Sequence, residues 1–320
     1  MNGVKAKESP VMPGQDKHIE RFADDCELRG MSSSTVERYV SSIKAFRGYI
    51  ETKGYSFVDA ADREVLRDFL DYLRRDRRLS QKTIENSFTA LSSFYEYLEY
   101  EGYVDKNPVG SVRKRYIRRY KDHEEGQMRK LISIEDMARL INSTLDIRDK
   151  AIITVLAKTG IRRKELIALD VSDLDFIEQR IKLKPAAKRT NRTVFFDDET
   201  AVILRRWMRT REGRNTKGSQ SLFINSVGDR LERHGVYEVV SNAAIRTGIH
   251  DPTSDKMEDH FSPHCCRHWF TTHLRRAGMS REFIQELRGD ARKEAIDIYD
   301  HIDKKELRES YLAHIPQLGI

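Results

Sequence analysis

The feature that most constrains the fold is the spacing of apolar residues over the first 110 positions, which is helical throughout. Apolar residues that recur every three to four positions lie on one face of a helix and bury that face. Ser34, followed three residues later by Glu37, matches the capping box that starts a helix. We therefore expect a flexible start at 1–14 and an all-α four-helix domain at 15–110, with helices near 17–29, 34–50, 62–75 and 80–98.

A different pattern follows the Asn107-Pro108 pair, which interrupts the helical spacing. Residues 111–130 are expected to form a linker, and residues 131–320 a second domain. In that domain, helical stretches alternate with three short runs typical of strands, at 180–184, 192–196 and 221–225. We predict a mainly helical α+β domain with a small antiparallel sheet, ending in an apolar tail at 311–320.

The chain is basic, with 58 Lys and Arg against 51 Asp and Glu and a net charge of +7. A positive balance suits a polyanionic partner, most simply nucleic acid. The segment 111–121 holds six basic residues and no acidic one, so we interpret the linker as a strap that follows phosphates. Two groups of residues are expected to contact DNA: Arg74, Arg75, Arg77 and Arg78 in a turn between helices, and Arg113, Lys114, Arg115, Arg118 and Arg119 in the linker.

Composition also bounds the compartment. The chain has three cysteines, Cys26, Cys265 and Cys266, and two of them are adjacent, which is no disulfide framework. The first residues lack the apolar run of a signal peptide, and no stretch approaches the ~18 apolar residues of a membrane span. We therefore expect a cytoplasmic protein with no membrane partner.

The stretch HFSPHCCRHWFTTH at 260–273 is the densest cluster of reactive side chains. Zinc sites need spaced ligands, whereas two adjacent cysteines on a helix point about 100° apart. His264 and His268 share a helix face but lack the glutamate of a metalloprotease motif, so a zinc hydrolase is the weaker hypothesis. His264 and Arg267, three residues apart, also point the same way, and a guanidinium fork matches phosphate oxygens.

Two further stretches complete a pattern. TGIRRKEL (159–166) resembles the TG-L/I-R-x-x-EL box of tyrosine recombinases, the phage-integrase type. SPHCCRHWFTTHLRRAG (262–278) resembles their PH-x-x-RH box, and IQELRGD (284–290), followed nine residues later by a tyrosine, resembles the box that ends in the nucleophile. The three boxes occur in the family's order, and the N-terminal helices resemble its core-binding domain, so the likeness covers nearly the whole chain.

The resemblance implies a site-specific DNA recombinase. Such enzymes break a DNA strand through a 3′-phosphotyrosyl link and rejoin it, without ATP, metal or other cofactor, in integration and excision or in dimer resolution. Carried onto this chain, the resemblance makes Tyr299 the nucleophile and Arg162 and Arg267 the clamp on the phosphate oxygens. His264 would donate to the phosphate or accept the proton of Tyr299. The implied partners are double-stranded DNA at a specific site, further copies of the chain, and accessory proteins of unknown identity.

Two positions depart from the family pattern. The general-acid lysine lies in a β-hairpin, and the hairpin here offers Lys188, with Lys184 as the rival, but lacks the usual glycines. Asp290 stands where the family usually has histidine or tryptophan, and an ionised carboxylate repels phosphate. We expect Asp290 to form an orienting ion pair with Arg288 or Arg292; the alternatives are a protonated Asp290, or His301 as the donor instead.

Besides the zinc hydrolase, two other functional interpretations are open. A type IB topoisomerase would use the same cleavage chemistry to relax supercoils. A catalytically impaired relative would bind DNA as an accessory protein, and Asp290 keeps that alternative open. The apolar tail favours the recombinase, because such tails pack into a neighbouring protomer in this family, giving dimers to tetramers on DNA; the alternative is a tail that folds back on its own domain.

Overall fold

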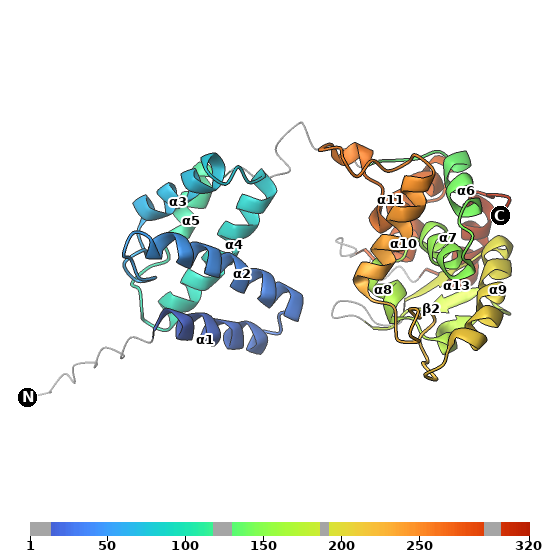
Figure 1. Ribbon diagram of the computed structural model, residues 1–320, viewed down its shortest axis with the longest axis horizontal. Helices are drawn as coiled ribbons and strands as arrows, with labels where there is room; N and C mark the ends of the chain where they lie inside the picture. Colours follow the sequence, from blue (N-terminus) through green and yellow to red (C-terminus); the bar gives the residue numbers. More distant parts are fainter. Residues whose placement is uncertain (1–13, 118–129, 186–191, 291–301) are drawn as a thin grey trace, which may run out of the picture. The chain divides into compact units, whose positions relative to one another are not determined.

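The structure, a computed structural model, describes residues 14–117, 130–185, 192–290 and 302–320. The chain divides into two compact units, Met1–Gly126 and Gln127–Ile320. Both are mainly helical, and the second contains a small antiparallel sheet, so the predicted fold class is confirmed (Figure 1). Among the described helices, none has the length and apolar character that crossing a membrane requires.

The first unit is a helical bundle held together by aromatic side chains. Phe22 meets Phe94 edge to face at 5.3 Å between ring centroids, and Phe46 meets Phe69 at 4.9 Å, geometries that aromatic rings favour. The predicted starts at Asp62 and Ser80 are correct, since both side chains cap helices. The described helices here are α1 (Gln15–Leu28), α2 (Ser33–Glu51), α3 (Arg63–Arg75), α4 (Gln81–Tyr100) and α5 (Val109–Tyr116).

Two details of this unit differ from expectation. Helix α2 begins at Ser33, after Ser32, so the capping box predicted at Ser34 is wrong. Residues 111–116 of the predicted linker belong to α5, which packs on α3 and α4. Val109 and Val112, three residues apart, bury one face of α5 in the core, while its basic residues stay on the other face. The basic composition concealed this short apolar stripe.

The second unit is built around one buried helix. Every residue of α7 (Ile147–Thr159) from Ala151 onward is buried, as expected for a helix surrounded by other elements. Figure 1 shows α7 in the middle of the unit, where it contacts neighbours on several sides. Those neighbours are α6 (Ile134–Asn142), α8 (Arg163–Ala168), α9 (Asp198–Arg214), α10 (Arg233–Arg246) and α11 (Pro263–Arg276).

The sheet has the order β1-β2-β3, all antiparallel, from β1 (Leu174–Asp175), β2 (Arg180–Lys182) and β3 (Thr193–Phe195). Two of the three predicted strands are confirmed, but 221–225 makes only isolated bridges and β1 was not predicted. Two carbonyls of this segment accept from side chains of α9: Trp207 donates to the Leu222 oxygen at 2.9 Å, and Arg211 to the Ser221 oxygen at 2.9 Å. These backbone groups are therefore satisfied by side chains instead of a continuous strand partner.

The C-terminal segment packs on its own unit. Helix α12 (Arg281–Arg288) precedes the final helix α13 (Lys304–His314), and Tyr311, Ile315 and Leu318 are all buried. The Tyr311 hydroxyl donates to the Lys158 carbonyl at 2.9 Å. This is the fold-back arrangement, the alternative to packing of the tail into a neighbouring protomer on DNA.

Gly160 ends α7 at a position that only glycine fits. Its φ of +60° is in the left-handed region, and an added Cβ would lie 2.3 Å from the Phe270 ring. We expect Gly160→Ala to destabilise the second unit by about 2–4 kcal/mol, from left-handed strain plus overpacking, measured by denaturant unfolding. Gly213→Ala, in α9 with open space around it, is the matched control and should be neutral or slightly stabilising. Equal effects of the two changes would contradict this account.

Candidate active site

Arg162 is positioned by the turn between two helices. After Gly160 the chain turns, and Arg162 becomes the N-cap of α8. Its main-chain nitrogen donates to the Glu165 carboxylate at 2.6 Å, and its guanidinium reaches the same carboxylate at 3.2 Å and the Arg288 carbonyl at 3.1 Å. The side chain is still about half-exposed, so its remaining donors are accessible.

Arg267, on α11, is buried, with 4% of its surface exposed. Its guanidinium donates to the Gly160 carbonyl at 2.6 Å and to the Arg288 carbonyl at 2.7 Å. Burial, together with the charges of Arg162 and Arg288, lowers its pKa to about 10. That value is still well above neutral pH, so the side chain remains a cation, and its charge is stabilised by backbone dipoles instead of water.

Asp290 joins the two arginines. One of its carboxylate oxygens lies 3.2 Å from Nη2 of Arg162 and 3.2 Å from Nη2 of Arg267. Its other oxygen lies 3.0 Å from Nε of Arg288, which agrees with the ion pair predicted between these residues. Two guanidinium groups from motifs about a hundred residues apart therefore share a single anionic oxygen.

An open cavity of about 420 Å³ borders the arginine pair. His264 lies in its lining at the start of α11, exposed, with Arg162 and Arg267 beside it. Sequence reasoning missed the other basic and aromatic lining groups, which no motif singles out: Arg163, Lys164, Arg233 and Tyr237. Burial, together with the charge of Arg233, lowers the pKa of Arg163. The cavity lining contains no carboxylate among the described residues, so it favours an anion.

Arg192 is a further residue near the site that the sequence motifs did not single out. It is 7% exposed, and its guanidinium lies 2.7 Å from the Glu165 carboxylate, which also holds Arg162. It packs directly over Gly289, where an added Cβ would approach Nη1 of Arg192 to 2.1 Å. The glycine of the RGD element is thus required both by its φ of +63° and by Arg192.

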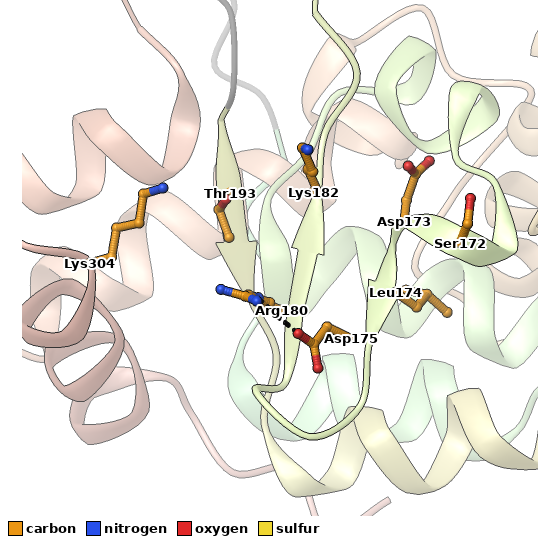
Figure 2. A pocket seen from close by; sticks show the side chains of 8 residues that line it. All are labelled: Ser172, Asp173, Leu174, Asp175, Arg180, Lys182, Thr193 and Lys304. Carbon is orange, nitrogen blue, oxygen red and sulfur yellow. Dashed lines mark hydrogen bonds and ion pairs between the residues drawn. The ribbon is translucent and has the colours of Figure 1, made fainter.

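Of the two lysine candidates, the structure describes Lys184. The ammonium of Lys184 forms an ion pair with Asp170, which also accepts from Arg230 at 2.6 Å. Figure 2 shows the strands of this hairpin, with Lys182 on β2 next to Thr193 on β3. The cavity drawn there, about 480 Å³, mixes acidic and basic side chains and shares no lining residue with the arginine cavity, so we place the candidate site at the arginines.

The basic cluster of the first unit is partly engaged within that unit. Arg74 donates to the Tyr116 carbonyl at 2.8 Å, Arg75 pairs with Asp71 at 2.8 Å, and Arg113 donates to Thr89 at 3.1 Å. The other members of the predicted cluster that the structure describes are exposed: Arg77, Arg78, Lys114 and Arg115. The remaining predicted groups lie outside the described residues: Arg118, Arg119, Lys188, Arg292, Tyr299 and His301.

The adjacent cysteines are packing residues. Cys265 and Cys266 are buried against the core of the second unit, and Cys26 is buried in the first. Within the described ranges, no three His, Cys, Asp or Glu side chains are arranged to hold a metal ion. The site is therefore defined by cations converging on one anion position, in a mainly helical domain.

Comparison with known proteins agrees with this geometry. The sequence model of the phage integrase family matches residues 123–306, and that of its N-terminal SAM-like domain matches residues 19–105. Similar curated proteins include tyrosine recombinase XerC of Oceanobacillus iheyensis, 27% identical over 94% of this chain and 96% of the relative. XerC of Bacillus subtilis is 28% identical over 93% and 96%.

Solved structures share the fold. The XerH site-specific recombinase bound to its difH substrate is 20% identical, with a TM-score of 0.64 over 91% of this chain and 83% of that one. A lambda integrase dimer bound to a COC′ core site is 15% identical, with a TM-score of 0.65 over 90% and 98%.

This chain belongs to the phage integrase family. It is a site-specific tyrosine recombinase, an enzyme that cleaves and rejoins DNA. The relatives named above are recombinases and lend no support to the topoisomerase or accessory-protein alternatives.

The burial of the cysteines has a direct test. Burial raises the pKa of the Cys26 and Cys266 thiols, so little thiolate is present at neutral pH, and reagents have no access to it. We expect a colorimetric disulfide reagent at pH 8 to label the native chain only slowly and to find three thiols at once in guanidinium. Rapid labelling of any thiol in the native chain would contradict their assignment as packing residues.

Proposed function

We propose that Tyr299 is the nucleophile of this recombinase and that Arg162 and Arg267 hold the phosphate it attacks. One observation carries the proposal: Nη2 of both arginines lies 3.2 Å from the same carboxylate oxygen, so the two groups can share one anionic ligand. A phosphorane gains negative charge on its non-bridging oxygens, and positioned cations stabilise that charge. Loss of one such donor typically lowers the rate by ~10²–10³.

The remaining steps concern protons. A phenol has a pKa near 10, so forming the nucleophile at neutral pH costs about 4 kcal/mol without assistance. In the proposed reaction the bond from Tyr299 to phosphorus forms while the bond to the 5′-oxygen breaks. His264 accepts the proton of Tyr299 or donates to the phosphate, and its place in the cavity beside both arginines supports this role.

Lys188 is the proposed acid that protonates the leaving 5′-oxygen. The ion pair of its rival with Asp170 supports this choice, because Lys184 would have to leave a carboxylate to approach DNA. Hydrogen bonds from Lys184 and Arg230 hold the pKa of Asp170 below its usual range, which favours the ionised carboxylate that this ion pair requires. Lys184 therefore has an electrostatic reason to stay where it is.

The proposed partner is double-stranded DNA at a specific site, which both units contact. XerH and lambda integrase were solved in complex with DNA, and this chain shares their fold. We propose that the N-terminal domain (15–110) and the catalytic domain (131–320) each contact the duplex. Exposed Arg77, Arg78, Lys114 and Arg115 suit backbone phosphates, as contacts that position without reading sequence. We place this reaction in the cytoplasm.

Copies of the chain are proposed to assemble on DNA by exchanging their tails. In the single chain, the Glu199 carboxylate accepts from the main-chain nitrogens of Leu318, at 2.9 Å, and Gly319, at 2.5 Å. Buried Lys158 donates to the Pro316 carbonyl at 2.6 Å and pairs with Asp197 at 2.6 Å. The same pocket would receive a neighbour's tail, so exchange replaces identical contacts.

The nucleophile can be identified with nicked suicide duplexes whose core sequence is randomised. Cleavage near the nick releases a short strand, so the covalent protein–DNA adduct accumulates. We expect an adduct with the wild-type chain and none with Tyr299→Phe, because a phenylalanine has no hydroxyl to attack phosphorus. The readout is an adduct that survives denaturing gels, followed by sequencing of the captured DNA.

The matched control is Tyr311→Phe. Tyr311 is fully buried, so this variant should still form the adduct, at a stability cost of about 1 kcal/mol for the lost hydrogen bond. A chelator should leave the reaction unchanged, whereas a zinc hydrolase would lose activity. An adduct formed by Tyr299→Phe would refute the assignment of the nucleophile.

Glu199→Gln tests the tail pocket. Removing the carboxylate charge weakens the acceptor for two main-chain nitrogens and takes one partner from the buried Lys158, which should cost about 1–3 kcal/mol. We expect faster carboxypeptidase digestion of the free chain and fewer dimers on the captured duplex in native gels. Glu212→Gln, exposed on the same helix, should change neither. Faster digestion with unchanged dimers would rule out exchange through this pocket.

A further inference from the structure

Asp290 is the group in the candidate site that the family resemblance leaves unexplained. A residue there would ordinarily donate to the scissile phosphate, and an ionised carboxylate only accepts. Its oxygen instead takes one donor from each of the two arginines proposed to clamp that phosphate. One donor of each arginine is therefore already bound to an anion within the chain.

The backbone presents the Asp290 carboxylate to this position. Gly289 ends α12 in the left-handed region, and the Asp290 nitrogen donates to the Gln285 carbonyl at 3.1 Å, which fixes the main chain at the helix end. The Asp290 side chain is 31% exposed, so rotation about its own bonds can move the carboxylate away from the two arginines. The second oxygen of Asp290 lies 3.0 Å from Nε of Arg288, so Arg288 can remain the partner of the carboxylate after it leaves the other two arginines.

The arginines do not depend on Asp290 for their placement. Arg267 is held by the Gly160 and Arg288 carbonyls, and Arg162 by the Glu165 carboxylate and the Arg288 carbonyl. Withdrawal of Asp290 therefore leaves both guanidinium groups in place, with one donor each turned toward the incoming ligand. Such a site is preorganised for an anion and occupied by an internal one.

We infer that Asp290 occupies the place of the scissile phosphate in the free enzyme, and that DNA phosphate binds only by displacing it. The inference rests on the proposed function of Arg162 and Arg267 as the phosphate clamp. Asp290 is then a specificity-determining residue: the free site discriminates against small anions, and a phosphate enters when the rest of the duplex contributes binding energy. Neutralising Asp290 removes the competitor.

The test compares inorganic phosphate binding by the full chain and by three variants. Asp290→Asn keeps the shape and removes the charge, Asp290→Ala removes the side chain, and Asp255→Asn makes the same charge change at an exposed position elsewhere in the second unit. Calorimetry at constant ionic strength gives the dissociation constants, and a far-ultraviolet melt checks that each variant is folded. We expect both Asp290 variants to bind phosphate about tenfold more tightly or better, and Asp255→Asn to match wild type.

A double variant, Asp290→Asn with Arg162→Gln, locates the effect. Because the gain comes from a freed arginine donor, the double variant should lose it. The inference is overturned if both Asp290 variants bind phosphate within twofold of wild type, or if the double variant keeps the full gain.

The two hypotheses fail in different measurements. An adduct that still forms in Tyr299→Phe speaks against the proposed nucleophile and leaves the phosphate comparison intact. Tighter phosphate binding with an adduct that still requires Tyr299 supports both. Slower adduct formation by Asp290→Asn without any change in phosphate affinity would mean that the carboxylate assists the reaction, and would overturn the inference.

Discussion

The second unit depends on one buried cation, the guanidinium of Arg267. A charge removed from water is tolerated only where other dipoles and charges replace the water, and here two backbone carbonyls do so. Those carbonyls belong to Gly160, at the end of α7, and to Arg288, at the end of α12. Solvating one side chain therefore brings together the ends of two helices and the middle of a third, and the candidate site is where they meet.

The shared carbonyl of Arg288 links the arginine pair. It accepts from Arg162 at 3.1 Å and from Arg267 at 2.7 Å, so two like charges approach one another around a common dipole. Their repulsion is offset by Glu165 on one side and Asp290 on the other. An arrangement of this kind favours one anion position between the two cations, and Asp290 occupies it in the free chain.

The sequence was most informative where a local signal decides the structure. Periodicity, caps and glycine ends predicted α1 to α4 closely, and two motifs predicted that Arg162, Arg267 and His264 lie together. It failed where a distant partner decides. The segment 221–225 forms isolated bridges and gives two of its carbonyls to α9 side chains, and Arg192 joins the site through Glu165 and Gly289. Neither contact leaves a mark in the local pattern, and the same holds for the short apolar face of α5.

The contacts of Lys158 tie the C-terminal residues to the central helix α7. The Lys158 ammonium is fully buried and donates to the Pro316 carbonyl, while the main-chain carbonyl of Lys158 accepts from the Tyr311 hydroxyl. Gly160, two residues after Lys158 and just past the end of α7, accepts a hydrogen bond from Arg267 through its carbonyl oxygen. Clipping of the last few residues by a contaminating protease would thus be felt at Lys158, two residues before the glycine whose carbonyl supports Arg267. Purified samples merit an intact-mass check, and affinity tags belong at the other terminus.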